Sequence, residues 1–183
     1  MRRRVAPSSG RLLQMDVFEA VRTVLAVREY DSRPVPDDIV RTIVEAGHLT
    51  ASSMNAQPWH FVVVRDPATM QQLGAQAKSG PYTAQASFAI AVCIDHESQF
   101  GVSDASRAAQ SMMLVAWEHG VGSNWVGFGG LEAAGKLLDV PAGYDVLALL
   151  PFGYPKAAHT RGKKQRKPLG EVASSERWGQ PFE

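Results

Sequence analysis

The sequence has a single cysteine, Cys93, among its 183 residues. An internal disulfide is therefore impossible, and a zinc site built from several cysteine thiolates is excluded. No stretch of the sequence reaches the roughly 18 consecutive apolar residues of a transmembrane helix. Charge is balanced as well, with 19 Lys and Arg against 18 Asp and Glu. That balance excludes a histone-like polycation but leaves room for a local basic patch.

What the sequence does contain is an ordinary globular composition, with 45% apolar residues. A chain of this length folds by default as one domain, and we expect that domain to span residues 15–183. The chain begins with Met1 and three arginines, but no apolar stretch follows them because Pro7, Gly10 and polar residues intervene. We therefore expect a disordered extension rather than a signal peptide, with Met15 as an alternative start and a cytoplasmic location.

Apolar spacing and turn residues predict the regular elements. Helices are expected over residues 16–27, 37–47, 67–77, 104–119 and 131–138. Strands are expected over residues 59–64, 88–94, 123–128 and 146–152, and a short helix with a tail over 171–183. The 104–119 helix is apolar on more than one face, which indicates a central position or one against a partner subunit. Because helices and strands are interspersed, the class is α/β or α+β.

Residues of the catalytic types give little support to nucleophilic or metal chemistry. Ser52 and Ser53 lack a G-x-S-x-G frame, and Cys93 stands inside the apolar run FAIAVCI, where a buried and unreactive thiol is expected. The five histidines show no metal-ligand spacing. The glycines at 120–130 do not complete a dinucleotide-binding fingerprint. We therefore assign no catalytic side chain and no metal site.

Three segments are rich in groups that bind anions or polar rings. Arg28 follows the first predicted helix, residues 161–167 carry five basic side chains, and residues 50–58 are dense in hydroxyl and amide groups. One bound phosphate together with a polar heterocycle would use all three segments. A solvated charged loop and a polar turn would have the same composition, and the spacing between them does not decide which interpretation holds.

The order of the segments carries a more specific signal. The chain reads AVREYDSRPVPDDIVRTIVEAG, then TASSMNAQPWHFVVV, then DASRAAQSMMLVAWEHGVGSNWVGF, then KKQRKPLGEV and ERW. In that order, from about residue 16 to residue 178, it resembles the FMN-dependent nitroreductase family. The strongest motif is SSMNAQPW at residues 52–59, which the family writes roughly as P-S-S-x-N-x-Q-P-W; Ala51 stands in place of the leading proline.

The resemblance implies an α+β, three-layer fold with a central, mostly antiparallel sheet flanked by helices. It also implies an intertwined homodimer with two FMN sites at the interface, each built from both chains. The apolar 104–119 helix would then be shared between subunits, and the C-terminal tail would reach across the partner, because an obligate interface is core-like in composition.

The resemblance also implies roles for particular residues. Arg28 matches a basic residue of the first phosphate motif, and the loop at 52–57 matches one that lines the ring and ribityl chain, from the other subunit. Residues 126–129 match a segment whose backbone passes one edge of the ring, and a basic pair near 165 matches the phosphate site. The matching positions are Leu25, Ala26, Arg28, Ser52, Ser53, Asn55, Gln57, Val126, Gly127, Phe128, Gly129, Lys164 and Arg166; Lys163 and Lys167 match no contact.

One departure from the family pattern concerns the first phosphate motif. Family members often read R-R-S-x-R where this chain has Val24-Leu25-Ala26-Val27-Arg28. An arginine and a serine hydroxyl are therefore absent, and only the backbone N–H groups of Leu25 and Ala26 remain available there. A related protein that uses a deazaflavin stays open as an alternative.

The function implied is hydride transfer from NAD(P)H through FMN to an electron-poor acceptor such as a nitroaromatic, a quinone or an activated alkene. The flavin would carry the chemistry. Related folds also host dehalogenation and ring oxidation, and a flavin-binding member without turnover is a further alternative. The rival from another class is a nucleic-acid-binding module that uses the 161–167 basic loop. Balanced charge and the lack of a stacking aromatic in that loop count against it, so we expect no nucleic-acid partner and no membrane contact.

Overall fold

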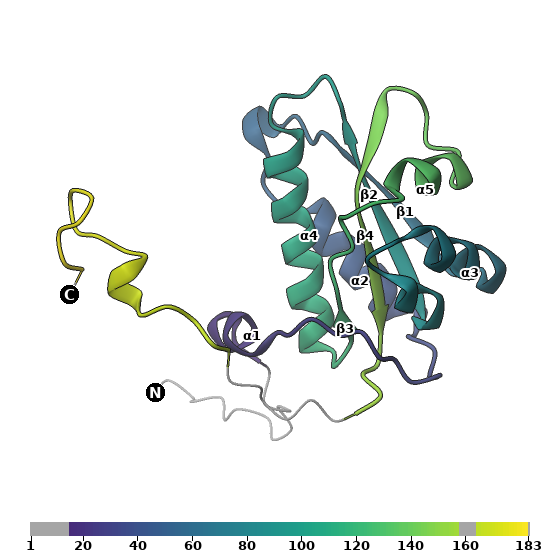
Figure 1. The fold of residues 1–183 in the computed structure, drawn as a ribbon, viewed down its shortest axis with the longest axis horizontal. Helices are drawn as coiled ribbons and strands as arrows, with labels where there is room; N and C mark the ends of the chain where they lie inside the picture. The colour runs from purple at the N-terminus through teal and green to yellow at the C-terminus, as the bar shows by residue number, and fades with distance from the viewer. Residues whose placement is uncertain (1–14, 158–163, 183) are drawn as a thin grey trace, which may run out of the picture.

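The computed structural model describes residues 15–157 and 164–182. Its centre is a four-stranded sheet in the order β1-β2-β4-β3, in which every neighbouring pair is antiparallel. The strands are β1 (Trp59–Val64), β2 (Phe88–Asp95), β3 (Gly122–Ser123) and β4 (Tyr144–Gly153). Antiparallel pairing throughout makes the class α+β and confirms the mostly antiparallel sheet that the resemblance implied (Figure 1).

Helices cover both faces of this sheet, which gives three layers (Figure 1). One face packs against α2 (Asp37–His48) and α4 (Gly101–Glu118), and the other against α3 (Pro67–Gln76) and α5 (Leu131–Leu137). The central strand β2 alternates between the layers, since neighbouring strand residues point to opposite faces. Its residues 88, 90 and 92 join the α2–α4 core, and residues 89, 91 and 93 join the α3–α5 core.

The close packing of α2 on α4 depends on Gly47. A Cβ atom at this position would lie 3.0 Å from both Cγ and Sδ of Met112, which is tighter than ordinary side-chain contact. The helix, which was expected to end at residue 47, continues to His48. Gly47 therefore allows α2 and α4 to pack closely and does not end its helix.

Several predicted boundaries were wrong. Helix α1 (Val17–Thr23) ends well before residue 27, because residues 24–27 become extended and the Val27 N–H bonds the Ser123 carbonyl at 2.9 Å. Helix α4 begins three residues before Asp104. Of the strand predicted at 123–128, only Ser123 belongs to β3, and a single bridge joins Val126 to Leu149. The Asn124 N–H reaches the Pro151 carbonyl at 3.4 Å, but Pro151 has no N–H to return, so the ladder is incomplete between them.

The C-terminal segment, residues 164–182, extends away from the sheet past α1 (Figure 1). It contains a 3₁₀ turn at Leu169–Glu171 and an antiparallel bridge between Ser174 and Pro181, instead of the short helix with a tail predicted over 171–183. The Ser174 hydroxyl accepts the Gly179 N–H at 3.0 Å, so side-chain hydrogen bonding favours turns here. No helix in the described parts of the chain combines the length and apolar character needed to cross a bilayer.

Candidate functional site

The predicted site residues fall into two groups at opposite ends of α4. The loop at 52–57 is tied to Asp104 near the helix N-terminus, and residues 24–28 follow Thr23, which bonds Trp117 near the C-terminus. Asp104 and Trp117 are 13 residues apart, which is about 20 Å along a helix that rises 1.5 Å per residue. Within one chain the two groups therefore lie far apart along α4, and we call each of them a candidate half-site.

The loop half-site is Ser52–Gln57. Its 3₁₀ turn spans Ser53–Asn55, and the Gln57 N–H donates to the Ser52 hydroxyl at 2.9 Å while the Gln57 side-chain amide donates to the Asn55 carbonyl at 3.1 Å. Asn55 and Gln57 are exposed, and Ser52 and Ser53 are half-buried. The loop thus presents polar groups outward while its own hydrogen bonds fix its shape.

The backbone of this loop is strained. Met54, Asn55 and Gln57 have φ values of 51°, 55° and 50°, in the left-handed region that costs a residue with a side chain about 1 kcal/mol or more. Asparagine tolerates this region better than most residues. Three such residues within four positions persist only when the surroundings hold them, which is typical of a ligand-binding loop.

The strained loop is held by Asp104, a residue that the sequence analysis did not single out. Its carboxylate is fully buried, accepts the Ser53 N–H at 2.9 Å and is ion-paired with Arg107. Burial by itself would raise the pKa of Asp104, but the Ser53 N–H and the Arg107 guanidinium outweigh it and lower the pKa below its ordinary value. The signal in the sequence is an acid in the first turn of an alanine-rich helix, three residues before an arginine.

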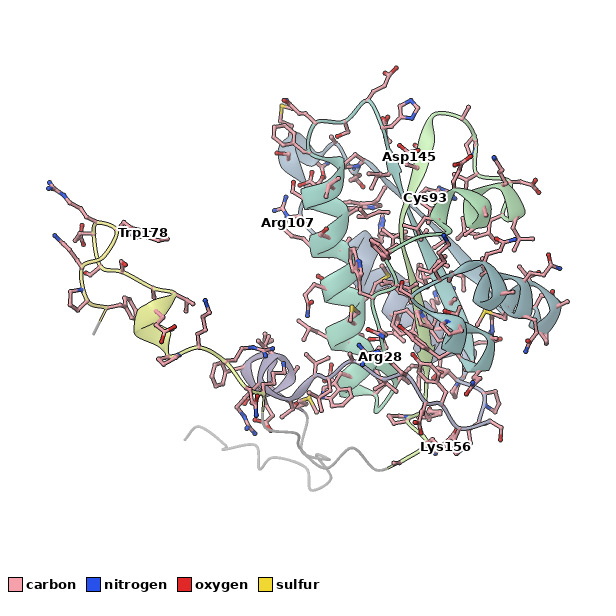
Figure 2. The ribbon with its side chains drawn as sticks, viewed as in Figure 1. Arg28, Cys93, Arg107, Asp145, Lys156 and Trp178 are labelled. Carbon is pink, nitrogen blue, oxygen red and sulfur yellow. The ribbon has the colours of Figure 1, made fainter. Side chains whose placement is uncertain are left out.

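The second half-site begins with residues 24–28. Ala26 lies beside Ser123 in a parallel bridge, and the Thr23 hydroxyl accepts the Trp117 indole N–H at 2.9 Å. Ala26 and Arg28 are exposed, and Leu25 is half-buried. Figure 2 shows Arg28 near the foot of α4 and Arg107 higher along it, so the two arginines mark the two half-sites.

The segment after β3 continues this half-site. Val126 is buried and exchanges two backbone hydrogen bonds of 2.9 Å with Leu149, which fixes the path of the exposed residues 127–129. A Cβ atom at Gly127 would lie 2.4 Å from the Trp125 indole nitrogen. Phe128 is 78% exposed, and its carbonyl accepts a 3.0 Å hydrogen bond from the Ser79 hydroxyl. Residues 127–129 therefore follow a fixed backbone path and carry a single side chain, the exposed ring of Phe128.

The basic pair lies next to α1. The Lys164 ammonium donates a 2.6 Å hydrogen bond to the Val21 carbonyl. Burial, and then the nearby charge of Arg166, lower the pKa of Lys164. An anion bound beside Lys164 would favour its charged form again. Arg166 is exposed, and Lys163 and Arg161 of the same basic loop lie outside the described residues.

Cys93 takes no part in either half-site. Its side chain is 1% exposed, and burial raises the pKa of the thiol to about 11. A thiol that stays protonated at neutral pH is a poor nucleophile. The predicted buried and unreactive Cys93 is confirmed.

The fold and the two half-sites define a class: an α+β protein with a strained polar loop at one end of its long helix and a basic, glycine-containing site at the other. The model of the nitroreductase family matches residues 22–101 and 83–154. The chain belongs to the nitroreductase family, as its motifs indicated.

Relatives and solved structures agree with this assignment. A protein of Methanothermobacter thermautotrophicus, which is named as an NADH dehydrogenase/NAD(P)H nitroreductase, is 32% identical over 154 residues, which are 80% of this chain and 81% of the relative. The NADPH-flavin oxidoreductase of Vibrio harveyi is 26% identical over 158 residues, 74% of this chain and 65% of that protein. A crystal structure of a similarly named protein from Parabacteroides distasonis superposes with a TM-score of 0.82 at 26% identity, covering 88% of this chain and 98% of the other.

Proposed function

We propose that the protein is an FMN-dependent oxidoreductase that moves a hydride from NAD(P)H through FMN to an electron-poor small molecule, such as a nitroaromatic, a quinone or an activated alkene. The observation that carries the proposal is the pair of half-sites at opposite ends of α4 in a chain of the nitroreductase family. Each half-site matches one part of a flavin nucleotide, and a second chain is needed to bring the parts together.

The residues present fit FMN. The phosphate needs cations and N–H donors, which Arg28, Lys164, Arg166 and the backbone of Leu25 and Ala26 offer at one end of α1. The ring needs a flat approach, and residues 127–129 include two glycines on a path fixed by Val126. The mutual repulsion of Lys164 and Arg166 is relieved when a dianion lies between them.

Each group of residues has a separate task when FMN is bound. Arg28, Lys164 and Arg166 would hold the phosphate, and the planar guanidinium of Arg166 is the group suited to bind it in a bidentate way. Ser52, Ser53, Asn55 and Gln57 of the partner loop donate and accept hydrogen bonds along the ring and the ribityl chain. The backbone of Val126–Gly129 excludes water from one edge of the ring. The flavin supplies the redox chemistry, and no acid–base side chain is assigned.

The partner is a second copy of this chain, and exposed apolar side chains support that part of the proposal. Val17 and Phe18 of α1 are 78% and 75% exposed, and Trp178 is fully exposed at the far end of the C-terminal segment (Figure 2). Leu169, Val172 and Phe182 extend this apolar surface along the same segment. A single chain rarely leaves so many large apolar side chains in water, so a homodimer in which the segment lies on the partner accounts for their exposure. We place the dimer in the cytoplasm.

The test begins with the colour of the purified protein. A yellow protein that releases FMN on denaturation, and that oxidises NADH or NADPH when a quinone is added, would support the proposal. A colourless protein that takes up no added FMN would refute it. Release of a deazaflavin would identify that compound as the cofactor in place of FMN. A yellow protein that oxidises neither NADH nor NADPH with any acceptor would be a flavin binder without turnover.

A further inference from the structure

The hydrogen bond from Ser53 to Asp104 links the strained loop to α4. Within residues 15–157 and 164–182, the other hydrogen bonds of residues 52–57 lie inside the loop or join the Gln57 carbonyl to the N–H of Trp59, the first residue of β1. Those local bonds close the 3₁₀ turn, but they do not fix the loop relative to the helix. The Asp104 carboxylate does so, because it belongs to a long helix that packs on the sheet.

Asp104 is also unusual among the acids of this chain. It is fully buried, whereas the acids in the first turn of α2, Asp37 and Asp38, are exposed. Its oxygens are occupied by the Ser53 N–H and by Arg107, and the Ser103 hydroxyl lies 3.5 Å away. Loss of these partners would leave a buried charge uncompensated and would strongly destabilise the fold. The Asp104 carboxylate, the Ser53 N–H and the Arg107 guanidinium therefore hold one another in a single arrangement.

We propose that Asp104 is a positioning residue for the flavin site. Through the Ser53 N–H it keeps Met54, Asn55 and Gln57 in the left-handed conformation that directs the loop toward the partner's flavin, and it does so without touching the flavin itself. Arg107 keeps the carboxylate charged and screened from water. The inference rests on the proposed function, because it assigns the loop to FMN.

The hydrogen bond between Ser53 and Asp104 can be broken from the loop side, by removing its N–H donor, as well as from the helix side, by changing its acceptor. Ser53 is the first residue of its 3₁₀ turn, a position that accepts proline. Ser52 before it has φ −127° and ψ 159°, the extended conformation that a following proline requires. Ser53→Pro therefore deletes the hydrogen bond to Asp104, and Ser53→Ala, which removes only the hydroxyl, is its matched control.

The experiment measures FMN affinity of the apo-protein by quenching of flavin fluorescence, and amide hydrogen exchange over residues 50–58 without FMN. Ser53→Pro should bind FMN on the order of tenfold more weakly than Ser53→Ala, with faster exchange over 50–58. Asp104→Asn should show the same two changes, and Asp38→Asn, in the first turn of α2, should show neither. If Asp104→Asn does not fold, the Ser53 pair decides alone.

Equal FMN affinity and equal exchange for Ser53→Pro and Ser53→Ala would overturn the inference and leave the proposed function standing. An unaltered chain that takes up no FMN would overturn the proposed function and, with it, the inference. Faster exchange without any change in affinity would make Asp104 a purely structural residue, which also overturns the positioning role.

Discussion

The ammonium group of Lys164 donates to the backbone carbonyl of Val21, 143 residues earlier in the chain, at 2.6 Å. This bond fixes the start of the C-terminal segment against α1, directly before the residues that match the phosphate motif. In the phosphate site that we propose, Val24 and Ala26 stand where the family often has an arginine and a serine. The charge at the site therefore rests on Arg28, Lys164 and Arg166.

Arg166 should contribute most to phosphate binding. Arg166→Ala should weaken FMN binding roughly ten- to a hundredfold, since hydrogen bonds to charged groups are worth about 1.5–3 kcal/mol. Lys167→Ala removes the same charge from an exposed neighbour without a matched contact, so its effect should be limited to screened long-range attraction. Fluorescence titration of the apo-protein measures both. Equal losses would show that the loop acts only as a diffuse positive field.

Asn55 has two tasks that substitution can separate. Asn55→Ala should weaken FMN binding roughly two- to tenfold through the lost amide, and it should also lower the melting temperature, because alanine tolerates a φ of 55° poorly. Asn55→Gly removes the amide but suits the backbone, so it should lower affinity without lowering stability. Wild-type affinity in the glycine variant would limit Asn55 to a conformational role.

The chain should be a homodimer at micromolar concentration by size exclusion with light scattering. Acrylamide should quench Trp178 poorly in the assembled protein, although a single chain exposes it fully. The Trp178→Phe variant supplies the background of the other tryptophans. A monodisperse monomer that still holds FMN would refute both the dimer and the shared site.

Burial of Cys93 predicts a pH dependence of stability. The pKa of the thiol rises from its ordinary value of 9.0 to about 11 in the folded chain. The folded state therefore holds this proton more tightly, and the resulting stability is complete below pH 9 and is lost as the pH rises through 11. Relative to Cys93→Ala, the wild-type free energy of unfolding should fall by roughly 2 kcal/mol between pH 8 and pH 11. A constant difference across that range would show that the thiol is not shielded.

The fold was predictable where pattern and packing agree. The strands at 59–64 and 88–94 are apolar runs rich in β-branched and aromatic residues, and both form as expected. The segment at 123–128 is less apolar, and its ladder with β4 is incomplete because Pro151, opposite Asn124, has no N–H. The first helix ended early for a related reason: residues 24–27 gain more from lying beside Ser123 than from continuing the helix. Both deviations depend on neighbours that are distant in sequence.

The site was predictable only as a set of residue types. The motif at 52–59 indicated a polar loop, but its spacing carried no information about three left-handed residues within four positions. Asp104 was missed because the burial of an acid is decided by what packs around it. The separation of the half-sites along α4 is likewise a property of the fold, since it depends on which residues lie beside each end of the helix.

The central strand β2 has a consequence for how this chain is made. Phe88–Ile94 is a run of seven apolar residues without a charge or a proline, the kind of segment that aggregates when exposed. Its first partner, β1, leaves the ribosome before it, but its second partner, β4, begins about 50 residues later. At a synthesis rate of about 5–20 residues per second, one edge of β2 stays unpaired for roughly 2–10 s. Slower translation across residues 95–144 should therefore reduce the soluble yield more than the same delay placed after residue 153.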